Sequence, residues 1–336
     1  GMEYPMICFN YGRTNPDGTY TEATKNGMIG VIIHEVGHNF FPMIINSDER
    51  QWTWMDEGLN TFVEYLTEEL FDNKFPSRRG PAWTITDYMK LPKDQLEPIM
   101  TNSENIIHFG PNAYSKPATG LNILRETIMG RELFDYAFKE YARRWAFKHP
   151  EPADFFRTME DASGEDLDWF WRGWFYGTDP CDISLDSVKY ARANIDPEIP
   201  EPRTTMQSLQ KPIVHSFEDI SKIRNREEGI VFMTDKDTTL RDFYWRYARG
   251  IEPYDTTKYE VVNDFPIEGL NDEEKAKIAN KHFYELHFSN KGGLVMPIII
   301  EWTFTDGTKE VDRIPAQVWR HNENKVTKFF MKDKEV

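Results

Sequence analysis

The 336-residue chain has only two cysteines, and neither belongs to a recognisable metal or disulfide pattern. Cys8 and Cys181 lie far apart in the sequence, and neither has a second cysteine at the Cys-x-x-Cys spacing. A thiolate zinc site or a disulfide framework needs several cysteines at short spacings. We therefore expect neither of these, and we expect both cysteines to be free thiols.

Long apolar runs are also absent from the sequence. The longest, residues 27–33 and 293–300, are much shorter than the roughly 20 residues that a helix needs to cross a bilayer. The first residues lack the basic start and continuous apolar stretch of a secretory signal peptide. We expect no membrane span and no signal peptide in this chain, and its compartment stays open.

Basic residues are outnumbered by acidic ones. The 40 lysines and arginines stand against 56 aspartates and glutamates, which gives a formal net charge of −16. No long cluster of basic residues occurs anywhere in the chain. Because nucleic-acid binding depends on basic side chains that neutralise phosphates, we expect no nucleic-acid partner.

Residues 34–38 read His-Glu-Val-Gly-His, and Glu57 follows after a spacer of eighteen residues. On a helix, His34 and His38 lie about one turn apart on the same face, so that both can bind one metal ion. The pentapeptide also arises by chance, but its surroundings favour two helices. An apolar run leads into the motif, and a second helical pattern begins near Asp56, which we interpret as its N-cap.

Two histidines and one carboxylate predict a catalytic zinc site rather than a structural one. Three protein ligands, His34, His38 and Glu57, leave the fourth position of a zinc ion open for water. Glu35 lies next to His34 and is suited to act as the general base. The sequence thus predicts one Zn²⁺ per chain.

These residues resemble the zinc aminopeptidases of the aminopeptidase N and leukotriene-A hydrolase type, in the gluzincin clan. That family has Trp-x-x-Glu-Gly around its third zinc ligand, and residues 54–58 read Trp-Met-Asp-Glu-Gly. In the family, a strand that ends in Met-Glu precedes the zinc-binding helix, and Met2 and Glu3 of this chain resemble that pair. Tyr4 departs from the asparagine that usually follows.

The resemblance implies roles for three further residues. Glu3 would bind the free α-ammonium group of a substrate, although a solvated terminal glutamate is the simpler alternative. Tyr114, in the segment Tyr-Ser-Lys, would donate a hydrogen bond to the developing oxyanion. Glu64 lies seven residues after Glu57, on the same helical face, and would accept the second N–H group of a ligating histidine. A surface glutamate is the alternative for Glu64.

The implied fold is multidomain and mainly α. Residues 1–188 would form a partial thermolysin-like zinc peptidase catalytic domain, residues 189–280 a linker and mixed charged region, and residues 281–336 a C-terminal β-rich domain. We expect that last domain to be an antiparallel β-sandwich of the Ig-like type. Helices are expected near residues 117–129, 131–147, 152–162 and 165–176.

The function implied by the resemblance is that of a zinc-dependent aminopeptidase. It would hydrolyse the N-terminal peptide bond of a peptide substrate with a free N-terminus, using zinc-activated water and Glu35 as the base. The alternatives are a gluzincin endopeptidase and a catalytically inert zinc-binding or peptide-binding fragment. Because the chain opens on the Met-Glu strand, we expect it to be a fragment without the N-terminal β domain of its parent protein, and without any targeting signal carried there.

Overall fold

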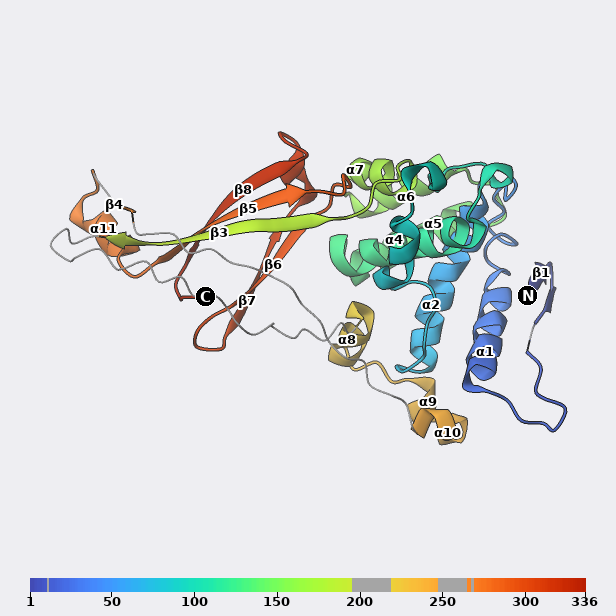
Figure 1. Cartoon of the computed structure of the whole chain (residues 1–336). Coiled ribbons are helices and arrows are strands. Elements are labelled where there is room, and N and C mark those ends of the chain that lie inside the picture. The colour runs from blue at the N-terminus through green and yellow to red at the C-terminus, as the bar shows by residue number, and fades with distance from the viewer. Residues whose placement is uncertain (11, 195–218, 247–264, 267–268) are drawn as a thin grey trace. The chain divides into compact units, whose positions relative to one another are not determined.

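The computed structural model describes residues 1–10, 12–194, 219–246, 265–266 and 269–336. The chain divides into two compact units, Gly1–Thr178 with Glu218–Ile251, and Asp179–Phe217 with Glu252–Val336. Figure 1 shows mainly helices in the first unit and mainly strands in the second. The expectation of a helical region followed by antiparallel β structure is confirmed at this coarse level.

Helix α1 (Glu22–Gly37) carries the first part of the His-Glu-Val-Gly-His motif. It begins after Thr21, whose side-chain oxygen accepts a hydrogen bond from the backbone N–H of Thr24, which satisfies a free donor of the first turn. The helix ends at His38, and Pro42 lies in the turns that follow. The motif therefore stands at the end of a helix, where the chain changes direction.

Helix α2 (Leu59–Phe71) continues directly from a single π-helical turn, Trp54–Gly58. Gly58 lies at the junction, where a Cβ atom would be only 2.6 Å from Cγ of Pro117 and 2.9 Å from the carbonyl oxygen of Ala113. Only glycine permits this approach. The turn that holds Glu57 is thereby packed directly against the segment that contains Tyr114.

The remaining α-helices of the first unit follow this pair in the chain. They are α3 (Thr86–Met89), α4 (Lys116–Ile123), α5 (Arg131–Trp145), α6 (Pro152–Ser163), α7 (Asp168–Phe170), α8 (Ile220–Glu227), α9 (Met233–Lys236) and α10 (Phe243–Arg246). Further single π-helical turns lie at Gly110–Ser115, Leu124–Ile128 and Trp171–Phe175. Among the described residues, no helix is both long and apolar enough to cross a membrane.

Aromatic packing fixes the π-helical turn at residues 54–58 in the core. Trp54 is 1% exposed, and its ring lies 4.8 to 5.8 Å from the rings of Phe155, Phe156 and Phe175. Such pairs add to the stability gained by burial alone. Since Glu57 lies three residues after Trp54, this cluster determines where the Glu57 carboxylate can point.

A buried ion network joins α8 to the other helices. Glu126 is 1% exposed, and it accepts hydrogen bonds from Arg125 at 2.9 Å, Arg131 at 3.0 Å and Arg224 at 2.7 Å. Arg224 belongs to α8, which follows β3 in the chain but packs in the first unit. A buried carboxylate requires partners of this kind.

A two-stranded antiparallel ribbon opens the chain. Its strands are β1 (Met2–Tyr4) and β2 (Ile7–Phe9), paired so that Glu3 lies opposite Cys8. Met6, in the connecting turn, has a φ angle of 64°. The ribbon contacts α1 and thereby brings Glu3 to the candidate site.

The second unit contains two sheets. In the first, the strand order is β4 (Phe265–Pro266), β3 (Ile183–Asn194), β5 (His282–Asn290) and β8 (Lys325–Lys332). In this sheet, β3 pairs with β5 and β5 pairs with β8 in antiparallel orientation, whereas β4 and β3 are parallel.

The second sheet is a hairpin of β6 (Ile298–Thr303) and β7 (Lys309–Ile314). Gly307, in its turn, has a φ angle of +82°, which glycine adopts without strain. Residues of β5 and β6, among them Leu286, Phe288 and Trp302, share one buried cluster with Trp319. The two sheets therefore pack over a common apolar core, and the short helix α11 (Asp272–Ile278) precedes β5.

Candidate metal centre

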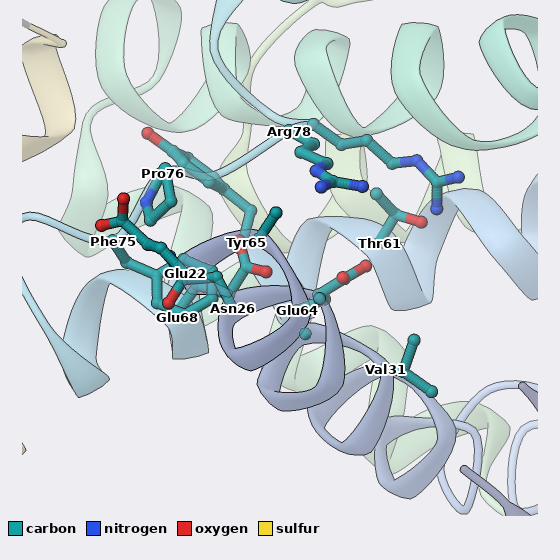
Figure 2. Close-up of a pocket in the computed structure, with 14 residues that line it drawn as sticks. Glu22, Asn26, Val31, Thr61, Glu64, Tyr65, Glu68, Phe75, Pro76 and Arg78 are labelled. Atoms are coloured by element: carbon teal, nitrogen blue, oxygen red, sulfur yellow. The ribbon is translucent and has the colours of Figure 1, made fainter. Parts of the chain in front are cut away.

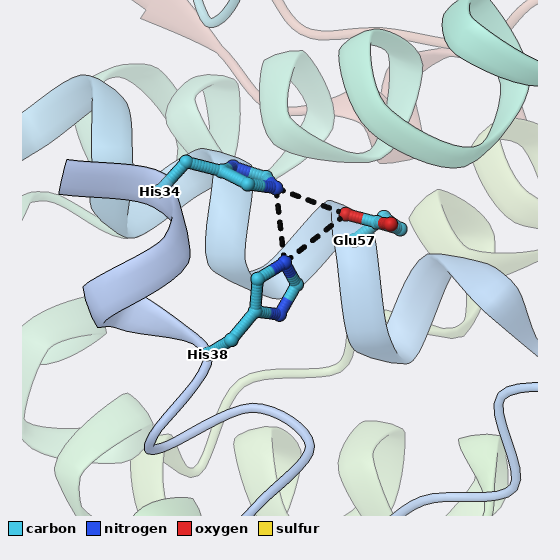
Figure 3. Close-up of side chains that lie close together, drawn as sticks. All are labelled: His34, His38 and Glu57. Carbon is cyan, nitrogen blue, oxygen red and sulfur yellow. Dashed lines mark hydrogen bonds and ion pairs between the residues drawn. The ribbon is translucent and has the colours of Figure 1, made fainter. Parts of the chain in front are cut away.

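Three side chains converge at the end of α1. The Nε2 atoms of His34 and His38 are 3.0 Å apart, and they lie 3.0 Å and 3.4 Å from Oε2 of Glu57 (Figure 3). Two of the residues come from the motif in α1, and the third comes from the π-helical turn before α2. The structure thus brings together the three residues that the sequence predicted as metal ligands.

The opposite nitrogens of both imidazoles contact acceptors. Nδ1 of His34 donates to Oε2 of Glu64 at 2.9 Å, and Nδ1 of His38 donates to the carbonyl oxygen of Phe41 at 2.7 Å. Because a carboxylate and a carbonyl can only accept, both Nδ1 atoms carry the proton of the neutral ring. Both Nε2 atoms then present lone pairs to the same point as the Glu57 oxygen.

This donor set fits a zinc ion. Three acceptors in close contact repel one another unless positive charge lies between them, either a metal ion or the protons that the imidazoles bind in its absence. With zinc–ligand distances of about 2.0–2.1 Å, ligand atoms of a tetrahedral site are roughly 3.3–3.4 Å apart. The observed separations of 3.0 to 3.4 Å are close to that value.

The electrostatics of the cluster favour positive charge. Burial disfavours the charged form of His34, but hydrogen bonds to Glu57 and Glu64 outweigh this and raise its pKa to about 9. The pKa of His38 is likewise raised to about 11, against burial, by Asp56 and Glu57. Burial acts to raise the pKa of Glu57, yet the two imidazoles lower it to about 2. A site that holds protons so tightly is also one that attracts a metal cation.

Asp56 does not have the role that its sequence position indicated. It is not the N-cap of a helix, because helical geometry already begins at Trp54. Its side chain is instead buried, and Oδ1 lies 3.1 Å from Nδ1 of His38. Burial raises the pKa of Asp56 to about 7. The prediction was wrong because a π-helical turn cannot be distinguished from a first α-helical turn by composition.

Glu35 and Tyr114 lie beside the three ligands. Glu35 is 4% exposed; its Oε1 atom lies 3.4 Å from the amino group of Gly1, and among the described residues Oε2 has no hydrogen-bond partner. The hydroxyl of Tyr114 donates to Oε1 of Glu57 at 2.5 Å, and its ring stacks on His34 at 5.8 Å. Burial and the charge of Glu57 raise the pKa of Tyr114 far above its usual value.

Glu3 reaches the same site from the N-terminal ribbon. Its Oε2 atom lies 3.8 Å from Nε2 of His38, and ligand atoms of Glu3, Glu35 and His38 all lie within 4.8 Å of one another. Burial raises the pKa of Glu3. The structure therefore places all seven residues predicted from the sequence in or directly around one site.

Asn60 is a supporting residue that sequence reasoning missed. Its side-chain amide donates to the carbonyl oxygen of His34 at 2.8 Å. A Cβ atom at residue 37 would lie 2.2 Å from Oδ1 of Asn60, so Gly37 is required for this contact between α1 and α2. The glycine within the motif was the available signal, because a small residue on a buried helix face indicates close packing.

A cavity of about 430 Å³ is lined by Glu64, the residue that accepts the hydrogen bond from His34 (Figure 2). This volume is typical of sites for small ligands. Among the residues that line it are Gly30 and Val31 of α1, Glu64 and Glu68 of α2, and Arg78 and Arg79 of the loop after α2. A Cβ atom at Gly30 would lie 3.0 Å from Oε1 of Glu68, so the glycine makes room for the carboxylates.

Residues 3–174 match the sequence profile of the peptidase family M1 domain. Because this match covers more than half of the chain, the chain belongs to peptidase family M1. The resemblance to zinc aminopeptidases noted in the sequence is thereby confirmed at the level of the family.

Several curated proteins are similar to this chain. Glutamyl aminopeptidase of Bitis rhinoceros is 27% identical over 240 residues, which cover 66% of this chain and 25% of that protein. Aminopeptidase N of Streptomyces lividans is 25% identical over 168 residues, or 46% of this chain and 19% of that protein. The matched part thus spans no more than a quarter of the length of these relatives.

Solved structures give similar but more distant matches. An M1 zinc metallopeptidase from Deinococcus radiodurans is 19% identical, with a TM-score of 0.38, and covers 54% of this chain and 39% of that chain. Aminopeptidase A of Legionella pneumophila, solved in complex with aspartic acid, is 12% identical, with a TM-score of 0.46, and covers 94% of this chain and 26% of that chain. The family assignment rests on the sequence match alone.

Proposed function

We propose that this chain is the catalytic part of a zinc-dependent aminopeptidase that hydrolyses the N-terminal peptide bond of peptides. The observation that carries the proposal is the arrangement of His34, His38 and Glu57, whose three acceptor atoms face one point. Membership of family M1 agrees with it, because similar proteins of that family are named as aminopeptidases and as a zinc metallopeptidase.

His34, His38 and Glu57 would hold one Zn²⁺. When bound, zinc polarises the scissile carbonyl and lowers the pKa of water. Glu35 is the base that takes the proton from the attacking water and returns it to the leaving amine. Its free Oε2 atom supports this role, because an acceptor without a partner is available for that proton.

Tyr114 is the proposed donor to the oxyanion. Its raised pKa keeps the phenol protonated at any working pH, so that it is a neutral donor. In the structure this proton goes to Oε1 of Glu57. For the proposed role, the Tyr114 hydroxyl would have to turn from Oε1 of Glu57 towards the substrate oxygen.

Glu3 is the proposed site for the substrate ammonium group. Its position beside His38 and Glu35 would place the first peptide bond of a substrate at the base. A carboxylate gains from this contact only when the substrate amine is free and charged. Recognition of the amine by Glu3 is what separates an aminopeptidase from the alternative, an endopeptidase with the same metal site.

The test compares fluorogenic aminoacyl amides that carry a free or an N-acetylated amine, using the zinc-loaded chain. We expect cleavage of the free amine only, and we expect Glu3→Gln to lower kcat/KM about tenfold or more because it removes a charged hydrogen bond. Glu132→Gln, an exposed glutamate of α5, is the control. Equal cleavage of both substrates would favour the endopeptidase, and zinc binding without any cleavage would favour the inert fragment.

Glu64 is expected to tune zinc affinity through His34. The carboxylate orients the ring and increases the basicity of Nε2, and loss of such a partner typically weakens binding about 10–100-fold. We expect Glu64→Gln to have this effect in competition with a chromophoric chelator. Unchanged affinity would show that Glu64 does not support the ligand.

The finer architecture is part of the proposal. We propose a partial thermolysin-like arrangement for the first unit and an Ig-like antiparallel sandwich for the second. The expected bounds 1–188, 189–280 and 281–336 differ from these units, because Ile183–Asn194 pairs with His282–Asn290 and residues 218–251 pack in the first unit. We further propose an N-terminal β domain of the same parent protein as a partner; the relatives, of which the matched part spans no more than a quarter, are long enough to contain further domains.

A further inference from the structure

Arg79 places a positive charge beside the candidate site. Its guanidinium carbon lies 4.2 Å from the centre of the Tyr114 ring, and that ring stacks on His34. Among the described residues, no carboxylate lies within ion-pair distance of Arg79. A guanidinium held against an aromatic face keeps its N–H edge available for a planar anion.

The backbone next to Arg79 is fixed. Gly80 has a φ angle of +103°, and a Cβ atom there would lie 2.3 Å from Cγ of Tyr65, which is 1% exposed. Only glycine combines this φ angle with so close an approach to Tyr65 of α2, so the backbone conformation next to Arg79 is restricted. Arg79 itself is only partly exposed. The guanidinium is therefore presented to the site by a constrained segment.

A series of contacts that passes the candidate metal ligands connects Glu3 with Arg79. Glu3 is 3.8 Å from His38, and His38 is 3.4 Å from Glu57. Glu57 in turn lies 2.5 Å from the hydroxyl of Tyr114, on whose ring Arg79 rests at 4.2 Å. An extended peptide rises about 3.3–3.6 Å per residue, so a peptide of a few residues can span this series of contacts.

We propose that Arg79 binds the free C-terminal carboxylate of a short peptide whose ammonium group lies at Glu3. The substrate class would then be peptides of a few residues with both termini free, since the bidentate fork of arginine matches a carboxylate. This inference rests on the proposed function and adds a determinant of substrate length.

Nearby carboxylates leave Arg79 available for this role. Glu64, which lines the same cavity, is already engaged by His34. Glu68 is 6% exposed, and burial together with the charge of Glu64 raises its pKa to about 8. The charge of Arg79 acts on the pKa of Glu68 in the opposite direction, but among the described residues the two side chains form no ion pair.

The experiment compares the tripeptide Leu-Gly-Gly with its C-terminal amide. Hydrolysis of both is measured with the zinc-loaded chain, and binding of both is measured by calorimetry with the Glu35→Gln protein. The variants are Arg79→Gln, Arg79→Lys as the conservative replacement, and Arg143→Gln as the control. Arg143 is an exposed arginine of α5 that does not line the cavity.

We expect the free acid to be preferred about tenfold to a hundredfold, mainly through KM, as for a charged hydrogen bond. Arg79→Gln should bring the ratio of kcat/KM for the acid to kcat/KM for the amide close to one. Arg79→Lys should restore part of this preference, and Arg143→Gln should leave it unchanged. Equal binding of acid and amide to the Glu35→Gln protein, or a preference that survives Arg79→Gln, would overturn the proposal.

The calorimetry separates this inference from the proposed function. If neither peptide is hydrolysed but the acid still binds more tightly and does so through Arg79, the carboxylate site stands and the proposed peptidase activity fails. If both are hydrolysed at the same rate and bind equally, the activity stands and the role of Arg79 fails.

Discussion

Glu35→Gln is expected to lower kcat about 10²- to 10⁴-fold on an aminoacyl amide with a free amine, which is the range that general acid–base catalysis contributes. Glutamine has nearly the shape of glutamate but cannot accept the proton of the attacking water. Glu35 is buried beside the ligands without being one of them, so zinc stoichiometry should stay at one per chain.

The measurement combines kcat from initial rates with zinc content after dialysis. Glu22→Gln is the matched control, because Glu22 lies on the same helix but is exposed at its first turn. Its kcat should equal that of the unmodified protein. A Glu35→Gln protein that retains both zinc and full activity would exclude Glu35 as the base.

His38→Ala is expected to weaken zinc binding about a hundredfold or more, because loss of even an outer partner of a ligand typically costs 10–100-fold. His38 is 1% exposed, and its Nε2 atom faces both other ligands. Zinc affinity should also fall as the pH is lowered. Protons compete for the same nitrogens of His34 and His38, whose pKa values are raised to about 9 and about 11.

Affinity is measured by competition with a chromophoric chelator, and circular dichroism checks that the variant is folded. His149→Ala provides the control. His149 is exposed, and its Nδ1 atom contacts only the carbonyl oxygen of Asn46 among the hydrogen bonds described. If a folded His38→Ala protein bound zinc as tightly as the unmodified chain, the metal would have to lie elsewhere.

The sequence predicts the relative positions of site residues when both belong to the same helix, because their spacing determines the face on which they lie. His34 and His38 are four residues apart on α1, and Glu57 and Glu64 are seven apart, so that helix geometry alone places each pair on one face. The contact between Tyr114 and Glu57 joins segments 57 residues apart, and family resemblance, not periodicity, pointed to Tyr114.

Long-range packing limited the remaining predictions. Arg79 drew no attention in the sequence, because nothing in a loop sequence shows that it lies over the ring of Tyr114. Strand β3 (Ile183–Asn194) was not expected, because the predicted boundary between the helix-rich region and the linker, residue 188, falls inside it. It is stabilised by pairing with β5, which lies about 90 residues later in the chain, and the local sequence does not indicate so distant a partner.

The close approach at Gly58 joins the turn of the proposed metal ligand to the segment of the proposed hydrogen-bond donor. Glu57 precedes this glycine, and Tyr114 lies next to Ala113, whose carbonyl oxygen the glycine faces. A change of the backbone at this glycine is therefore expected to move both residues. A substitution that reshapes this turn would move the Glu57 carboxylate and the Tyr114 hydroxyl at the same time. We therefore expect zinc affinity and kcat to change together in variants of this turn.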